Sequence, residues 1–374
     1  NVPPLRFPEF TEEWKAEQLD NIATLSKGIG ISKEQLSEDG EPCILYGELY
    51  TKYKSEIIKQ VESKTDINGS KLKRSKANDV IIPCSGETAV DIATARCVPF
   101  DNILFGGDLN VISLHQYDGA FMSYQLNGKR KYDIARVAQG VSIVHLYGEH
   151  LKAIKTYNPT LPEQQKIAKL LSLLDDRIDT QNKIIEDLKK LKSAISERLF
   201  KSVKGFTVLL SDLCDIVKGK QINGENLSDS GNYYVMNGGT EPSGYYDNYN
   251  VEASTISISE GGNSCGYVQF NTSPFWSGGH CYSIQNIADK VDNMYLYHYL
   301  KSNEDAIMKL RIGSGLPNIQ KKDLAMFKII VPKIEWQIKI STFLSSLERK
   351  AEIEERIQNV MQKQKLYLLQ QMFI

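Results

Sequence analysis

The chain has 374 residues, of which 41% are hydrophobic and 24% charged, and this length is enough for two or three domains with their own cores. The composition excludes a disordered chain, a collagen-like repeat and a disulfide-rich scaffold. The 45 basic and 46 acidic residues nearly balance, which excludes a uniformly basic nucleic-acid coat. Any contact with DNA or RNA must therefore use local patches.

The beginning of the chain carries neither an initiator methionine nor the apolar stretch of a signal peptide. Its longest apolar runs are far shorter than the roughly 18 to 20 residues that a membrane span needs. The six cysteines form no C-x-x-C pair, and we interpret them as reduced thiols in the core. These features predict a soluble, cytoplasmic protein without a membrane partner.

Residues 1–158 are expected to form a first mixed α and β domain. The apolar run at 79–82 ends in a glycine-containing turn and predicts a strand. Because this part carries 19 basic and 21 acidic residues, a face for DNA must be built from clusters. Tyrosines interleave with lysines at 46–54, as expected where cations contact phosphates and polar groups read bases. The candidate contacts are Lys27, Tyr46, Tyr50, Lys52, Lys54, Lys71, Lys73, Arg74, Lys129 and Arg130, and ordinary solvated surface is the alternative for each cluster.

Residues 159–203 are expected to form one long helix. Apolar residues follow steps of three and four, with charged residues on the other faces. Pro162 suits the first turn of a helix and Gly205 suits its end. The predicted apolar stripe consists of Ile167, Leu171, Leu174, Ile178, Ile185, Leu188, Leu191, Ile195 and Leu199.

Residues 204–333 repeat the first domain in degenerate form. The segment 19–28, which ends in Lys27-Gly28, reappears at 210–219, where it ends in Lys218-Gly219. Further along, 85–88 aligns with 260–263, and the closing segment 151–164 aligns with 324–337. Matches in the same order across both halves indicate a duplication. The second copy has 11 basic and 13 acidic residues, and its candidate phosphate contacts are Lys218, Lys220, Lys321 and Lys322.

Polar residues in the turns of both copies are the candidates for reading base edges. Turn capping is the competing role and is nearly as plausible for each of them. The candidates are Glu48, Ser85, Glu87 and Thr88 in the first copy, and Asn237, Thr240, Glu260 and Asn263 in the second.

Residues 334–374 repeat the long helix, with a stripe that includes Ile340, Leu344, Ile357 and Met361. About 40 residues make a rod of roughly 60 Å, too long for one small domain to cover. The two helices are therefore expected to pack together as an antiparallel coiled-coil spacer and to form a docking surface. The fold class is α+β, with two pseudo-repeated domains, each followed by a long helix. An amphipathic helix packed on its own domain is the alternative for each rod.

Sequence motifs for catalysis are missing. The chain has no G-x-x-x-x-G-K-[ST] phosphate loop, so ATP hydrolysis is not expected. Its five histidines show no metal-ligand spacing, and we interpret His145 and His150, which flank a Tyr-Gly-Glu turn, as surface histidines. We expect no catalytic residue, no cofactor site and no metal site in this chain.

With the duplication, the terminal helices and the missing catalysis, the chain resembles the specificity subunit of type I restriction-modification systems. The opening 5–10 with Trp14, the two Lys-Gly pairs, and the segments 159–167 and 332–337 resemble landmarks of that family. The resemblance covers essentially the full chain.

The resemblance implies two target recognition domains, 1–158 and 204–333, each reading half of a split double-stranded DNA sequence. It implies that the helices 159–203 and 334–374 hold them apart, with half-sites about one helical turn, roughly 34 Å, apart. It also implies docking of two methyltransferase subunits and of restriction subunits, which would use S-adenosylmethionine, ATP and Mg. The alternatives are a self-contained DNA-modifying enzyme, which needs catalytic motifs, and a coiled-coil scaffold, which does not need two large domains.

Overall fold

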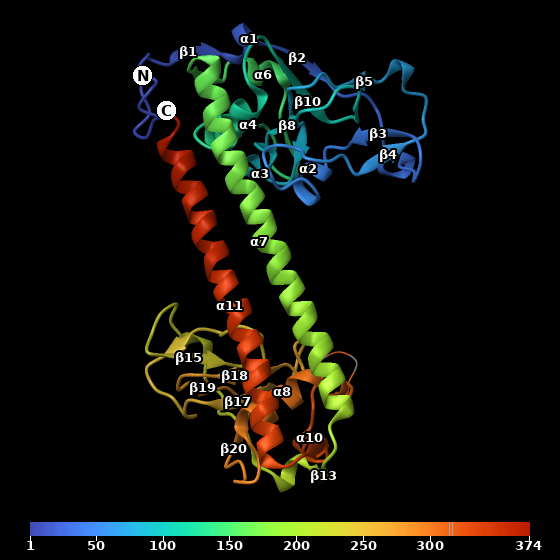
Figure 1. Ribbon diagram of the computed structural model, residues 1–374, viewed down its shortest axis with the longest axis vertical. Coiled ribbons are helices and arrows are strands. Elements are labelled where there is room, and N and C mark those ends of the chain that lie inside the picture. Colours follow the sequence, from blue (N-terminus) through green and yellow to red (C-terminus); the bar gives the residue numbers. More distant parts are fainter. Residues whose placement is uncertain (314, 316) are drawn as a thin grey trace. The chain divides into compact units, whose positions relative to one another are not determined.

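The computed structural model describes residues 1–313, 315 and 317–374, and these form two compact units. Unit 1 comprises Asn1–Asn182 and Arg356–Ile374, and unit 2 comprises Lys183–Glu355. Each unit combines β-sheets with a part of each of two long helices, α7 (Leu161–Ser202) and α11 (Ile334–Gln371) (Figure 1). The mixture of sheets and long helices confirms the predicted α+β class.

Unit 1 contains twelve described strands and six shorter helices. The strands are β1 (Lys15–Gln18), β2 (Ala23–Lys27), β3 (Glu41–Ile44), β4 (Ser63–Thr65), β5 (Lys73–Arg74), β6 (Asp79–Pro83), β7 (Ser85–Gly86), β8 (Arg96–Val98), β9 (Leu104–Phe105), β10 (Leu109–Leu114), β11 (Val144–His145) and β12 (Lys155–Asn158). The helices are α1 (Leu19–Ile22), α2 (Glu48–Thr51), α3 (Ala89–Ile92), α4 (Gly119–Asn127), α5 (Lys131–Val137) and α6 (Gly148–Lys152).

The main sheet of unit 1 is antiparallel and has the order β2-β10-β6-β8. The predicted strand at 79–82 is its central strand β6, whose residues are all buried. Such a continuous run of buried residues shows that both faces of β6 are covered. A second sheet, β4-β3-β9-β5, carries the segment that includes Lys73 and Arg74.

Unit 2 contains nine described strands and three shorter helices. The strands are β13 (Phe206–Leu209), β14 (Asp215–Lys218), β15 (Tyr233–Met236), β16 (Tyr245–Tyr246), β17 (Thr255–Ser259), β18 (Val268–Asn271), β19 (Trp276–Ser277), β20 (Cys281–Gln285) and β21 (Lys328–Val331). The helices are α8 (Asn293–Ser302), α9 (Glu304–Met308) and α10 (Lys321–Ala325). The main sheet is antiparallel with the order β14-β20-β17-β18, the same arrangement as in unit 1.

The duplication extends to single hydrogen bonds. At the start of α7, Gln164 accepts from the backbone N–H of Asp118 (2.9 Å) and donates to the carbonyl oxygen of Pro159 (2.8 Å). At the start of α11, Gln337 accepts from the N–H of Asp292 and donates to the oxygen of Pro332, both at 2.9 Å. These glutamines are buried and tie each long helix to the module before it.

The strand register corrects one part of the sequence alignment. Pro83 pairs with Leu109 in unit 1, and Ser259 pairs with Cys281 in unit 2. The residues that directly follow these strands therefore correspond to each other: Cys84 follows β6 in unit 1, and Glu260 follows β17 in unit 2. The alignment of Ser85 with Glu260 is wrong by one residue, because variable turns on either side leave its register undetermined.

In each unit, the local parts of α7 and α11 run antiparallel, as predicted. In unit 1, Gln358 donates to the side-chain oxygen of Asn182, and Lys365 lies 2.6 Å from Asp175. In unit 2, Lys192 forms a 2.5 Å ion pair with Glu348, and Lys189 forms a 2.6 Å pair with Glu355. Residue numbers along α11 thus decrease as those of their partners along α7 increase.

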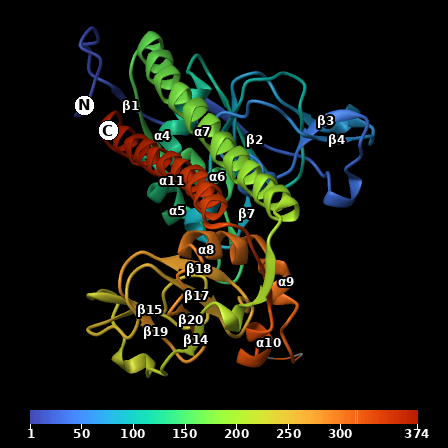
Figure 2. The ribbon, with the colours of Figure 1, turned by 60° about the horizontal axis from the view of Figure 1, so that its bottom comes forward.

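Helix α8, predicted from residues 293–300, lies between the main sheet and the long helices of unit 2 (Figure 2). Tyr295 and Tyr299 contact Phe200 of α7 edge to face, with ring centroids 5.7 and 5.2 Å apart. On the α11 side, the His298 ring nitrogen Nε2 lies 2.9 Å from the Ser345 hydroxyl. One apolar core therefore joins the sheet, α8 and both long helices.

The apolar stripes of the long helices are only partly covered. Ile167, Leu171 and Ile185 are buried on α7, and Ile340, Leu344 and Met361 are buried on α11. Other stripe residues remain exposed: Leu191 (50%), Ile353 (49%), Ile357 (38%) and Val360 (64%). At these positions the two helices do not bury the apolar stripe that was expected to pack in the coiled coil.

Candidate functional site

A cleft in unit 1 brings together four of the predicted contact residues, Tyr46, Tyr50, Ser85 and Glu87. Its volume is about 730 Å³, and α2, β7 and the turn after β7 contribute its walls. The Tyr50 hydroxyl donates to the carbonyl oxygen of Ser85 (3.2 Å), and burial raises the pKa of Tyr50 above its ordinary value. Tyr50 therefore remains a neutral phenol, while Tyr46 offers an exposed ring.

An aromatic and basic rim borders this cleft. Strand β7 pairs with β11, which sets Ser85 opposite His145. The His145 ring stacks on Tyr147 at 6.3 Å between centroids, and Lys27 Nζ lies 5.7 Å from the same tyrosine ring. Exposed aromatic faces next to a cation suit nucleotides, which combine π faces with negative phosphates.

Three other predicted residues of unit 1 have internal partners. Glu48 is buried, where it forms a 2.8 Å ion pair with Lys52 and accepts from the N–H of Leu45 (2.9 Å) and from the Ser63 hydroxyl. Thr88 caps α3 by accepting from the N–H of Asp91 (3.1 Å). Glu48 and Thr88 thus stabilise turns, which is the role that competed with base reading in the sequence analysis. Lys54 is exposed.

The basic candidates of unit 1 divide into bound and free cations. Arg74 forms a bidentate pair with Glu41 at 2.6 and 3.0 Å. Arg130 pairs with Asp133 at 3.0 Å and donates to the carbonyl oxygen of Ile374 (2.8 Å). The remaining lysines are exposed or half-buried: Lys71, Lys73 and Lys129.

The equivalent edge of unit 2 holds a charged cluster of Lys218, Glu260, His280 and Tyr282. Glu260 is buried, and its Oε1 accepts from Lys218 Nζ (2.6 Å) and from the Tyr282 hydroxyl (3.0 Å). Its other oxygen, Oε2, is buried without a hydrogen bond among the described residues and lies 3.7 Å from His280 Nδ1. Burial and the Glu260 carboxylate raise the pKa of Tyr282, so that it stays a neutral donor.

The surrounding loops of unit 2 hold the other predicted residues. Asn237 accepts from the backbone N–H of His280 (3.2 Å), which fixes the turn before β20. The backbone N–H of Lys220 donates to the Ser277 oxygen (2.8 Å), while its side chain is exposed. The remaining candidates are exposed: Thr240, Asn263, Lys321 and Lys322.

The candidate contacts from the sequence did not include the exposed His145, Tyr147 and His280 of these faces. His145, Tyr147 and His280 were interpreted as surface residues or left out, and each is indeed exposed. Their place beside Lys27 or Glu260 depends on strand pairing between distant segments. A signal was present in the sequence, because His280 follows the Gly278-Gly279 turn just before a strand.

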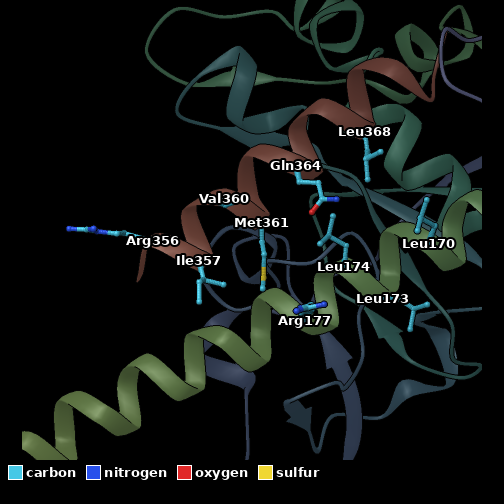
Figure 3. A pocket seen from close by; sticks show the side chains of 10 residues that line it. All are labelled: Leu170, Leu173, Leu174, Arg177, Arg356, Ile357, Val360, Met361, Gln364 and Leu368. Carbon is cyan, nitrogen blue, oxygen red and sulfur yellow. The ribbon is translucent and has the colours of Figure 1, made fainter. Parts of the chain in front are cut away.

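A second feature of unit 1 is an apolar groove between α7 and α11. Leucines of α7 and aliphatic residues of α11 face one another across it (Figure 3). Its volume is about 560 Å³, and Leu173 and Val360 are 51% and 64% exposed. The groove, here called the helix groove, is lined by Leu170, Leu173, Leu174, Arg177, Arg356, Ile357, Val360, Met361, Gln364 and Leu368.

Over residues 1–313, 315 and 317–374, no group of three or more His, Cys, Asp or Glu side chains could hold a metal ion. Within the same residues, no helix combines the length and the apolar character required to cross a membrane. The six cysteines are free and buried, as predicted, and burial raises the pKa of Cys84 to about 11.

Comparison with known proteins places the duplication in a family. The model of the type I restriction modification DNA specificity domain matches residues 11–190 and again residues 205–363. The two matches together cover most of the chain and correspond to the two copies.

Individual relatives agree with this match. A Mycoplasma genitalium protein provisionally described as a type I specificity subunit is 34% identical over 122 residues, which are 32% of this chain and 31% of that protein. The specificity subunit of the type I restriction enzyme MjaVIII of Methanocaldococcus jannaschii is 24% identical over 96% of this chain and 91% of its own length. The chain thus spans about a third of the first relative and most of the second.

Solved structures share the fold. The crystal structure of a type I restriction-modification S subunit from M. genitalium superposes with a TM-score of 0.70 at 19% identity, over 100% of this chain and 99% of that one. A chain from a study of complex assembly and conformational transition of the type I system has a TM-score of 0.60 at 16% identity, over 96% and 97% of the two chains.

Proposed function

The chain belongs to the type I restriction-modification DNA specificity family, and from this membership we propose that it recognises a bipartite double-stranded DNA sequence. Each copy reads one half-site. Residues 1–158 and 204–333 are the two target recognition domains, and the helices 159–203 and 334–374 space them.

One observation supports this proposal most strongly. The same sheet edge carries a lysine as the last residue of a strand in both copies, Lys27 in β2 and Lys218 in β14. Aromatic, amide or imidazole groups near each lysine differ between the copies. A shared frame with different polar residues is what two modules need in order to bind the same polymer but read different bases.

The exposed polar residues of the two edges are the proposed DNA contacts. In the first module, Tyr46 and Glu87 line the cleft, Lys27 lies over the Tyr147 ring, and Lys71 and Lys129 are exposed cations for phosphates. In the second, Lys220, Thr240 and Asn263 are exposed around the charged cluster, with Lys321 and Lys322 at the start of α10. Glu48 and Thr88 position turns.

The chain is proposed to be a non-catalytic subunit. Methylation with S-adenosylmethionine belongs to two partner methyltransferase subunits, and ATP- and Mg-dependent translocation and cleavage belong to restriction subunits. The helix groove is the proposed docking surface for a methyltransferase subunit, because it exposes apolar side chains of both long helices in one place. Free, buried cysteines support action in a reducing compartment such as the cytoplasm.

The experiment that tests this function is selection of DNA from a random pool. The full chain with its methyltransferase subunit is expected to enrich a split sequence with two defined parts and an undefined spacer. Enrichment of no sequence, or methylation of DNA by the purified chain alone, would contradict the proposal. A coiled-coil scaffold would give no enrichment, and a self-contained enzyme would modify DNA without a partner.

A further inference from the structure

The lysines at the equivalent sheet edges of the two copies have different electrostatic surroundings. Lys27 Nζ forms no ion pair among the described residues and lies over the Tyr147 ring. In the first copy, Cys84 occupies the position that corresponds to Glu260. Burial raises the pKa of the Cys84 thiol to about 11. A thiol with that pKa is neutral at pH 7, so the charge of Lys27 is not compensated.

Lys218 is bound to a carboxylate. Glu260 Oε1 accepts from its Nζ at 2.6 Å, and the Lys218 side chain remains 53% exposed while that of Glu260 is only 8% exposed. Glu260 is itself held by the Tyr282 hydroxyl at 3.0 Å. The ammonium group is therefore fixed in direction, and its charge is cancelled locally by its partner.

These differences change what each lysine can recognise. A free cation gains most from a phosphate, because it releases a counterion and needs no exact direction. A neutral pair gains little from counterion release, but its two remaining N–H groups point in set directions toward solvent. Directional donors suit a base edge with two adjacent acceptors, and in the major groove guanine offers N7 and O6.

We propose that Lys218 reads a guanine in the half-site of the second module and that Glu260 is its positioning residue, whereas Lys27 contacts a phosphate. This inference rests on the proposed function of the chain as a DNA-recognition subunit. His280 Nδ1 lies 3.7 Å from the other carboxylate oxygen, Glu260 Oε2.

The first experiment compares Lys218→Met with Lys220→Met in the complex of the full chain and its methyltransferase subunit. Lys220 is an exposed lysine two residues further on, without an ion pair among the described residues. Binding is measured on the selected sequence, on its single-base variants and over a series of salt concentrations. K218M is expected to lose a roughly 5- to 150-fold preference for guanine at one position, with little change in salt dependence.

K220M and Lys27→Met are expected to weaken binding on all sequences alike and to reduce the slope of log K against log salt by about 0.9. The opposite result for K218M, uniform weakening with a reduced slope, would show that Lys218 is a phosphate contact. Replacement of the guanine by 7-deazaguanine should weaken the wild-type complex but not K218M. Equal weakening of both would also overturn the inference.

Glu260→Gln separates positioning from simple structural support. The variant removes the compensating charge, so we expect tighter binding to random DNA, a steeper salt slope and a loss of guanine preference. A structural role alone would weaken binding to all DNA instead, and that outcome would remove Glu260 from the proposal. If the pool selects no sequence at all, the proposed function fails; if it selects one whose bases do not depend on Lys218, only this inference fails.

Discussion

Lys365 of α11 donates a 2.5 Å hydrogen bond to Glu56, although 309 positions separate the two residues. Its Nζ also lies 2.6 Å from Asp175 of α7 and 5.7 Å from the centre of the Tyr124 ring. Burial lowers the pKa of Lys365, but the two carboxylates outweigh burial, and the pKa lies above its ordinary value. The last turns of α11 are thus held against the first module by a cation that is only 16% exposed.

We expect Lys365→Met to destabilise unit 1 by about 3 to 5 kcal/mol. The variant leaves Glu56 and Asp175 buried together without their ion-pair partner, and such unpaired charges cost more than the pair itself contributes. The free energy of unfolding from urea titration, followed by a probe in unit 1, measures the effect. Lys363→Met, an exposed neighbour on α11, is the control. A loss below about 1 kcal/mol for K365M would contradict the prediction.

A second prediction concerns pH and His298. Burial lowers the pKa of this histidine from 6.5 to about 4, although Glu348 and Asp292 oppose the shift. In the unfolded chain the histidine binds a proton below about pH 6.5, whereas the folded chain does not until about pH 4. The contribution of the neutral His298 to the stability of unit 2 is therefore fully present above pH 6.5 and is lost as the pH falls toward 4.

The wild type should lose about 2 to 3 kcal/mol more than His298→Gln between pH 7.5 and pH 4.5, because glutamine does not titrate and keeps a polar group near Ser345. Urea unfolding at the two pH values measures this difference. His115→Gln alters an exposed histidine of unit 1 and serves as control. Equal losses for the wild type and H298Q would rule out His298 as the source.

Much of the fold was predictable because the duplication repeats local signals. Pro162 lies in the first turn of α7, which ends at Ser202 shortly before Gly205, as the sequence indicated. The aligned residues Gln164 and Gln337 have the same structural role, because both side chains make the same two hydrogen bonds. Signals of this kind depend on residues that are close in the chain.

The candidate site was less predictable because it depends on strand pairing. Whether Cys84 or Ser85 corresponds to Glu260 is decided by the register of β6 against β10, which the sequence of β6 alone does not determine. One partner of Glu48 likewise comes from outside its own turn, since Ser63 on β4, the neighbour of β3, donates its hydroxyl to this carboxylate. The sequence identified candidate residues by type, whereas contacts between distant segments determine which of them are exposed and which hold the fold together.

The helix groove gives a third prediction. Leu173→Asp combined with Val360→Asp should abolish assembly with the methyltransferase subunit, measured by co-purification, and should leave the free energy of unfolding within about 0.5 kcal/mol. Both side chains are more than half exposed, so charges there cost little in the free chain but much in a buried interface. Phe206→Asp, at an 84% exposed aromatic outside the groove, is the matched control. Assembly that survives the double variant would exclude the groove as the docking surface.

The basic segment 71–74, which ends in β5, gives a fourth prediction. Lys71→Ala should weaken DNA binding by a similar factor on all sequences and reduce the salt slope by about 0.9, because Lys71 is an exposed cation free to contact a phosphate. Arg74→Ala should instead affect mainly the sheet, since the Arg74 guanidinium is held by Glu41. Salt titrations of both variants distinguish the roles. A larger slope change for R74A than for K71A would reverse the assignment.

The last prediction is that exchange of residues 204–333 for the matching part of a relative changes only one half of the recognised DNA sequence. The exchange is structurally feasible because Phe206 pairs with Val331 and Leu209 with Lys328, so that the segment begins and ends on the neighbouring strands β13 and β21. Its ends fall between α7, which ends at Ser202, and α11, which begins at Ile334. The apolar contacts of Phe200, Ile340 and Leu344 must be retained by the donor, because these helix residues share the core of unit 2. Selection from a random pool before and after the exchange gives the two sequences. If both half-sites changed, or neither did, the two modules would not read DNA independently.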